Sequence, residues 1–373
     1  MNAGRLNAAL AAIQRDYEKN QIVPKLQELV NTLSNSISSS TEQNAIAFNA
    51  ALSELYSALD ESPSNSASQS RLGILEEIRA SNKVGLGLRK RIQKILEANN
   101  VTPANALAEL QKLLEELSRF AQIVTQMVAG FEELRIKYDD LGPGETEIGI
   151  TVPFLVVSSN LEGVGNELHE FDKALKIFGE LVEENPTSPI VKTIGSSALQ
   201  IFLESTPAIA LCVATALERL CALYKQILEI KLLRKKLGEQ SLPEKVTEPI
   251  EAYERQIATK AIEKIANDLV KEFSSKRDKA RENELKNGVR RALRFLAEQI
   301  DKGVDMEVRS EPPTAKAVAE SEGESVKSPA AKRALEEART TVTRIQNAGQ
   351  AMRALVRAKE PILALDQGSE KQT

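Results

Sequence analysis

The most apolar part of the chain is residues 196–233, SSALQIFLESTPAIALCVATALERLCALYKQILEIKLL. Whether this stretch crosses a membrane or lies in a protein core sets the class of the whole molecule. Its uncharged helical part, Pro207 to Leu217, has eleven residues. As a helix these residues span about 17 Å, against roughly 30 Å of bilayer hydrocarbon. Glu218 and Arg219 then interrupt the apolar run. We therefore predict a buried core helix, and a membrane-associated hairpin or short span is the alternative.

The residues just before this helix have a different period. Leu199, Ile201 and Leu203 occupy every second position, so they share one face of a predicted strand. Thr206 is a suitable N-cap, and Pro207 fits the first helical position, where a missing N–H costs nothing. The apolar stretch is therefore predicted to be a strand followed by a helix.

Two further segments alternate in the same way. In EIGITVPF, residues 147–154, every second side chain is apolar, and Pro153 suits an edge or a strand end. VDMEVR, residues 304–309, repeats the pattern. Strands with one polar face favour antiparallel or mixed pairing, because all-parallel sheets are buried on both faces. We predict a small two- or three-stranded sheet packed against helices.

Most of the remaining chain has the period of an α-helix. Pro103 follows the N-cap candidate Thr102, and an apolar seam then steps by three and four residues: Leu107, Leu110, Leu114, Leu117, Ala121, Val124, Val128 and Phe131. A second seam occupies residues 161–182. The predicted fold class is predominantly α-helical (α+β), with a helical N-terminal part, the small sheet in the middle and a C-terminal helix after a flexible linker.

Composition shifts divide the chain into regions. The glycines and proline of DDLGPGE, residues 139–145, end the first helical part, and SEPPTAKAVAESEGESVKSP, residues 310–329, has the acidic, Ala- and Pro-rich composition of a linker. The predicted regions are a helical region at 1–140, an α+β domain at 141–310, a flexible linker at 311–331, a C-terminal helix at 332–361 and a disordered tail at 362–373.

The C-terminal helix carries its own apolar stripe. Its candidate interaction residues share one helical face: Leu335, Val342, Ile345, Met352 and Val356. An amphipathic helix behind a flexible linker must bury such a stripe against something. We therefore predict self-association, or binding to a protein partner, through this helix.

Residues typical of catalysis or metal binding are scarce. His169 is the single histidine, which excludes HExxH and Cys/His zinc patterns, and no GxSxG motif accompanies it. The nearest Gly-rich basic stretch, VGLGLRKR at residues 84–91, lacks the P-loop spacing. We predict no catalytic, cofactor-binding or metal-binding residues and no cofactor, and we lean against an enzyme.

Residues 271–294 hold nine basic residues against four acidic ones. Possible weak phosphate contacts are five arginines of this segment: Arg277, Arg281, Arg290, Arg291 and Arg294. The interleaved acids and few aromatics fit a solvated face with i,i+4 pairs equally well. A net charge of −4 also gives no general attraction to nucleic acid or anionic lipid. Nucleic-acid and membrane partners are therefore disfavoured.

The chain contains two cysteines. Cys212 and Cys221 are nine residues apart on one predicted helix, half a turn out of phase, so they cannot pair with each other. With no secretory signal pattern at the N-terminus, we predict a cytoplasmic protein.

The predicted function is a non-enzymatic helical scaffold or interaction/regulatory protein acting through amphipathic and coiled-coil-like helices. The alternatives are a nucleotide-responsive regulator or enzyme with a site near the small sheet, and a membrane-peripheral protein.

Overall fold

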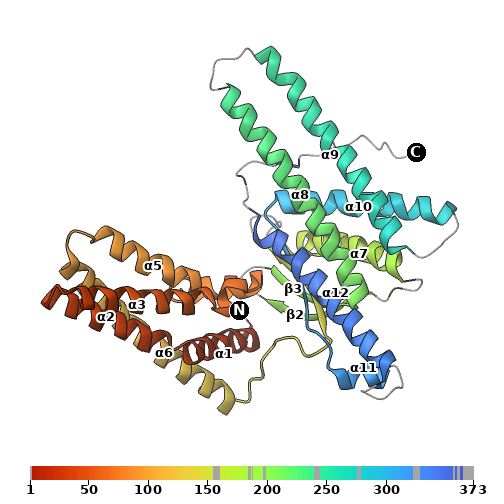
Figure 1. Cartoon of the computed structure of the whole chain (residues 1–373). Coiled ribbons are helices and arrows are strands. Elements are labelled where there is room, and N and C mark those ends of the chain that lie inside the picture. Colours follow the sequence, from red (N-terminus) through yellow and green to blue (C-terminus); the bar gives the residue numbers. More distant parts are fainter. Residues whose placement is uncertain are drawn as a thin grey trace. The chain divides into compact units, whose positions relative to one another are not determined.

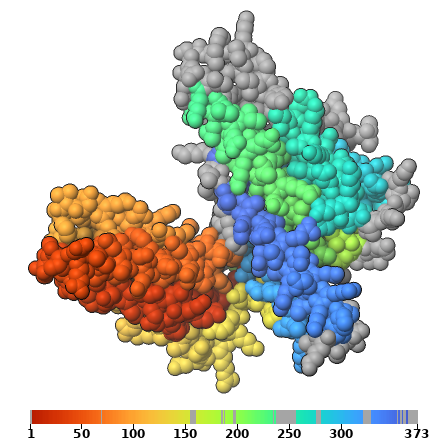
Figure 2. Space-filling view, viewed as in Figure 1, coloured from red at the N-terminus to blue at the C-terminus, as the bar shows by residue number. Residues whose placement is uncertain are grey.

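The computed structural model describes residues 2–153, 160–183, 186, 188–195, 199–238, 244–274, 279–321, 328–355, 358 and 362–363. The chain forms two compact units, Met1–Asp140 and Leu141–Thr373. Unit 1 is coloured red to yellow, and unit 2 continues from yellow to blue (Figures 1 and 2). The break between them lies in the DDLGPGE segment.

Unit 1 is built from helices. Its elements are α1 (Ala3–Lys19), α2 (Ile22–Ser38), α3 (Glu42–Asp60), the 3₁₀ turn η1 (Pro63–Ser66), α4 (Gln69–Glu77), α5 (Gly85–Ala98) and α6 (Pro103–Glu133). The predicted seam of α6 is confirmed, because Leu110, Leu117 and Val124 are buried. This seam packs against α1, α2 and α5 and forms the centre of the unit's core.

The chain segment after α6 returns to the start of α1 and closes unit 1. Arg5 Nε lies 3.2 Å from Asp139 Oδ2, and the Asn7 amide donates a hydrogen bond to the Ile136 carbonyl at 2.8 Å. Gly4 permits this approach, because a Cβ there would lie 2.9 Å from Asp139 Cβ. A side chain of any size at Gly4 would push the two segments apart.

Unit 2 contains a four-stranded antiparallel sheet in the order β2-β3-β1-β4. The strands are β1 (Thr146–Val152), β2 (Ile190–Gly195), β3 (Leu199–Glu204) and β4 (Asp305–Ser310). The three predicted strands are confirmed as β1, β3 and β4. The expectation of two or three strands missed β2, and the predicted strand residue Phe154 lies outside the described residues. Ile148 and Ile150 of β1 and Met306 of β4 lie on the core face of the sheet.

The helices of unit 2 are α7 (Leu161–Val182), α8 (Pro207–Gly238), α9 (Glu244–Phe273), α10 (Lys279–Asp301), α11 (Ala315–Ser321) and α12 (Pro329–Arg353). Of these, α8 and α12 pack directly against the sheet, at β1 and β4. Figure 1 shows α8 and α9 side by side as a long hairpin, and Figure 2 shows α12 packed along α8. Leu220 and Tyr224 of α8 are among the buried residues at the centre of the core.

Within the most apolar stretch, Leu199–Glu204 form the strand β3, and the helix α8 begins at Pro207. Among the described residues, Pro207–Leu233 is the one helical segment that is long and apolar enough to cross a membrane, and 67% of its apolar window is buried inside the chain. Glu218 and Arg219 do not end the helix, which continues to Gly238. The Arg219 side chain reaches outward to Glu272 of α9. Cys212 and Cys221 are both reduced thiols buried in the core.

The C-terminal region differs from the prediction in its linker, its last helix and its tail. The expected linker contains α11, where Ala, Lys and Glu favour a helix and Val318 and Ala319 are buried. The last helix, α12, ends at Arg353 and not at residue 361. Residues 322–327 lie outside the described part of the chain.

The expected disordered tail also begins with two buried residues, Ile362 and Leu363. Their backbone N–H groups donate to the Asp301 carboxylate at 2.8 and 2.7 Å. The Ala358 N–H donates to the hydroxyl of Tyr224 at 3.0 Å. Apolar burial and these hydrogen bonds tie the segment to unit 2, which offsets the entropy lost on ordering it.

Candidate interaction surfaces

The residues that the sequence singled out for chemistry do not form a reactive cluster. No group of three or more His, Cys, Asp or Glu among the described residues could hold a metal ion. His169 is exposed on α7, on the polar side of the predicted seam. Burial raises the pKa of the Cys212 thiol, so this cysteine is not a thiolate nucleophile at neutral pH.

Four of the five predicted phosphate-contact residues lie on α10, and two of them, Arg281 and Arg290, lie beside carboxylates. Arg281 bonds Glu284 at 2.6 Å and Glu180 at 2.8 Å, and Arg290 lies 3.8 Å from Glu263. The remaining three residues are Arg291, which is exposed, Arg294, which is half-buried, and Arg277, which lies outside the described residues. Internal pairing lowers the positive charge available to phosphate, and phosphate binding stays a prediction.

The predicted stripe of the last helix faces the core. Val342, Ile345 and Met352 are buried, Leu335 is half-buried, and Val356 lies outside the described residues. The stripe packs against α8 and β4, and Met352 Sδ lies 3.0 Å from Cys221 Sγ. The stripe is therefore not an open surface. Self-association stays a prediction that needs another surface to act through.

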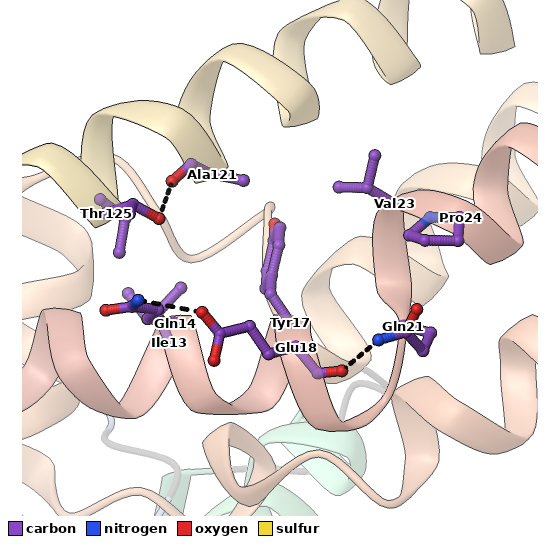
Figure 3. Close-up of a pocket in the computed structure, with 10 residues that line it drawn as sticks. Ile13, Gln14, Tyr17, Glu18, Gln21, Val23, Pro24, Ala121 and Thr125 are labelled. Atoms are coloured by element: carbon purple, nitrogen blue, oxygen red, sulfur yellow. Dashed lines mark hydrogen bonds between the residues drawn. The ribbon is translucent and has the colours of Figure 1, made fainter.

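Unit 1 has an apolar groove between α1, the α1–α2 corner and α6 (Figure 3). Its volume is about 240 Å³. It is lined by Ile13, Gln14, Tyr17, Glu18, Gln21, Val23, Pro24, Ala121, Val124 and Thr125. Ile13 and Val124 are buried beneath it, and most of the exposed lining is apolar. The groove is thus a hydrophobic recess in the helical surface of unit 1.

The sharp corner between α1 and α2 opens this groove. Gln21 adopts a left-handed backbone with φ +52°, which turns the chain directly from one helix into the next. Pro24 is tolerated in the first turn of α2, where its missing N–H would have no helical acceptor. Asp16 holds the end of α1 by accepting hydrogen bonds from Asn20 at 2.7 Å and from Ser62 at 2.5 Å.

The polar groups on the groove's rim bond to one another. Gln14 donates to the Glu18 carboxylate at 2.9 Å, Gln21 donates to the Glu18 carbonyl at 2.5 Å, and the Thr125 hydroxyl donates to the Ala121 carbonyl at 3.1 Å (Figure 3). An apolar group could therefore enter the groove without removing hydrogen-bond partners from buried polar atoms. Leaving such atoms without a partner would cost free energy.

Tyr17 lines the groove while its hydroxyl is engaged elsewhere. The phenol donates to the Lys83 carbonyl at 2.6 Å, and the ring meets Phe120 edge-on with centroids 6.2 Å apart. Burial, followed by the charges of Asp16 and Glu116, raises the Tyr17 pKa, so the phenol stays neutral. Tyr17 thus supplies a rigid aromatic wall.

A polar cleft of about 520 Å³ also occurs in unit 1, beside Glu116. Arg91 donates to this carboxylate at 2.6 Å, and Lys83 Nζ lies 3.3 Å away. The hydrogen bond from Arg91 is the main cause that lowers the Glu116 pKa. Glu116 is therefore ionised at neutral pH and held between two cations, which is a structural ion cluster and not a proton donor.

A second apolar surface lies at the β2 edge of the sheet in unit 2. Ile190, Val191 and Ile194 are 63%, 51% and 60% exposed. The opposite edge strand, β4, is packed by α12. A bulge at Lys192 shifts the register, so that Val191 pairs with Leu203 and Ile194 with Ile201. Val191 and Ile194 therefore both lie on the core face of the sheet, at a point the helices leave open.

The bulge explains why β2 was missed. Two same-face apolar residues separated by Lys-Thr break the alternation that identifies a strand. The available signal was composition, because Ile190, Val191, Thr193 and Ile194 are all β-branched. The groove was missed for another reason: a helical pattern of apolar residues does not show where the folded chain leaves the apolar face partly uncovered.

Comparisons of the chain with known protein-family models, with curated proteins and with solved structures give no match. Its function is therefore argued from its own surfaces.

Proposed function

We propose that the chain is a non-enzymatic helical scaffold, and that the groove of unit 1 receives an apolar side chain from a protein partner. The observation that carries this proposal is the apolar recess itself, about 240 Å³ in volume, with a rim whose polar groups are already bonded. Binding energy at protein interfaces concentrates in such recesses, where an anchor side chain is desolvated and the surrounding rim excludes water.

The rim also indicates the chemistry of the partner. Glu18 is exposed beside the recess, and Gln14 and Gln21 bond to it without neutralising its charge. A partner segment with a Leu, Ile or Phe anchor near a Lys or Arg would fill the recess and meet the carboxylate. An amphipathic helix presents such residues at i and i+4, which is the common geometry of groove recognition.

The test is a selection of phage-displayed random peptides on the full-length chain. Ala121→Trp fills the recess, and Ile123→Trp places the same side chain on an exposed position of α6 that does not line it. Selected peptides should share an apolar anchor near a basic residue. They should bind wild type and Ile123→Trp equally, and Ala121→Trp at least about tenfold more weakly.

A second variant tests the charge. Glu18→Gln keeps the shape of the rim and removes the carboxylate, so it should weaken peptides that carry a basic residue more than matched peptides that carry Gln. Circular dichroism would establish that each variant is folded. Peptides that bind Ala121→Trp as tightly as wild type, or a selection without enrichment, would overturn the proposed role of the groove.

A further inference from the structure

The β2 edge in unit 2 combines three features that bear on association. Beyond β2 no further strand occurs among the residues that the structure describes. Its three exposed apolar side chains are β-branched, the type that pairs best across strands. Edge strands of this kind are templates for adding another strand, and proteins usually protect them.

One usual protection, a charged residue on the edge strand, is weakened here. Lys192 is the one charged residue of β2. Its ammonium lies 2.7 Å from Glu145 Oε2, and this hydrogen bond is the main cause that lowers the Glu145 pKa. A carboxylate of the same unit therefore neutralises the lysine charge. The β2 edges of two copies of the chain would not repel each other strongly.

We propose that two copies of the chain associate through β2, which pairs antiparallel with β2 of the second copy about a two-fold axis. The sheets of the two copies then join into one continuous sheet. This inference goes beyond the proposed function, since it concerns unit 2 and does not depend on the groove. It also gives the predicted self-association a surface that is open, in place of the buried stripe of α12.

The register of the pairing follows from self-complementarity. With the axis between Lys192 and Thr193, Val191 of each copy lies opposite Ile194 of the other, and both pairs lie on the core face. Ile190 lies opposite Gly195, and Lys192 lies opposite Thr193, so no two lysines face each other. A two-fold interface requires this kind of reciprocal pairing, and like charges directly opposite would oppose it.

The size of the contact sets its strength. A six-residue strand pair with a few apolar side chains buries less than the roughly 1,200 Å² that is typical of stable interfaces. The dimer is therefore weak and concentration-dependent, with a dissociation constant on the order of micromolar or higher. Monomer and dimer exchange, and the fraction of chains in the dimer increases as the protein concentration rises.

Sedimentation equilibrium of the full-length chain over a wide concentration range tests the proposal. Wild type should show a monomer–dimer equilibrium, and Ile194→Lys should raise the dissociation constant at least about tenfold. Ile46→Lys is the matched control, because Ile46 in unit 1 is 61% exposed, as Ile194 is 60% exposed. The control should leave the equilibrium unchanged.

A mixing experiment identifies the register. Val191→Glu alone should also weaken the dimer. An equimolar mixture of the Val191→Glu and Ile194→Lys chains should restore it, because the introduced carboxylate of one chain faces the introduced ammonium of the other while the remaining Val–Ile pair is intact. A wild-type chain that is monomeric throughout, an Ile194→Lys chain that dimerises normally, or a mixture without restoration overturns the proposed pairing.

Discussion

The two units differ in what they can offer a partner. Unit 1 consists of helices, and each helix satisfies most of its backbone hydrogen bonds internally. Its surface therefore presents side chains only, and its candidate site is a recess between helices. Unit 2 contains a sheet, and a sheet strand at an edge has backbone groups directed away from its neighbour. The candidate interface of unit 2 is accordingly a strand. The difference shows how the type of secondary structure determines the type of interface.

Both cores join segments that lie far apart in the sequence. In unit 1, consecutive helices such as α2 and α3 pack together, and the last helix, α6, packs against the first two, α1 and α2. In unit 2, β1 pairs with β4 from the other end of the domain, and the Thr146 and Ser310 hydroxyls lie 2.8 Å apart. Closing such long loops costs entropy before the contacts form. Both units therefore depend on core packing to hold distant segments together.

The largest expected effect comes from truncating the two cores. Leu110 of unit 1 and Leu220 of unit 2 have no exposed surface. Each Leu→Ala substitution should cost about 2–5 kcal/mol of unfolding free energy, because it removes apolar contacts and leaves a cavity. Hydrogen exchange read by mass spectrometry should show lost protection in the unit that carries the substitution. Equal loss of protection in α8 from Leu110→Ala would contradict the description of two separate cores.

Two glycines should respond in opposite directions. A Cβ at Gly149 of β1 would lie 2.8 Å from Glu307 Cγ and 3.0 Å from the Phe202 ring. Gly149→Ala should therefore destabilise unit 2 by about 1–3 kcal/mol. Gly130 lies in α6 with open space around it, so Gly130→Ala should stabilise unit 1 by about 0.5–1 kcal/mol. Urea unfolding would measure both, and a loss at Gly130 would show that α6 is more crowded than it looks.

A smaller effect should appear as pH dependence confined to unit 2. Burial raises the Asp301 pKa above its usual value, more than the N–H groups of Ile362 and Leu363 lower it. The folded state thus holds this proton more tightly than the unfolded state does. The stability contribution of Asp301 should therefore be largest at low pH and fall as pH rises from about 4 through the raised pKa.

The variant Asp301→Asn lacks this titration and serves as the reference. The difference in unfolding free energy between wild type and Asp301→Asn should decrease with rising pH over that interval. A difference that is constant, or that grows with pH, would show that the two N–H donors outweigh burial at this carboxylate.

The smallest effect should come from removing surface ion pairs, and the loss of stability should be similar in the two units. Glu272 of α9 bridges Arg219 of α8 and Arg344 of α12, the latter at 2.7 Å. These groups are part-exposed, so Glu272→Gln should cost about 0.2–1 kcal/mol, and less at high salt. Asp60→Asn, which removes the partner of Arg89 in unit 1, is the matched substitution. An effect that salt does not change would contradict a mainly electrostatic role for either pair.

Local periodicity predicted most of the secondary structure. The seam of α6 and the alternation in β1, β3 and β4 were visible because neighbouring residues carry the pattern. The short uncharged run from Pro207 to Leu217 likewise identified α8 as a core helix. Each of these features is a property of residues adjacent in the chain, so the amino-acid sequence alone determined it.

Tertiary structure decided what lies exposed. It covered the stripe of α12 with α8 and β4, tied Ile362 and Leu363 to Asp301, and left the bulged strand β2 at an open edge. It also opened the groove of unit 1 at the left-handed residue Gln21. An apolar stripe shows that a surface must be buried, but which distant segment buries it depends on the packing of the whole unit. The candidate sites could therefore be located only from the folded chain.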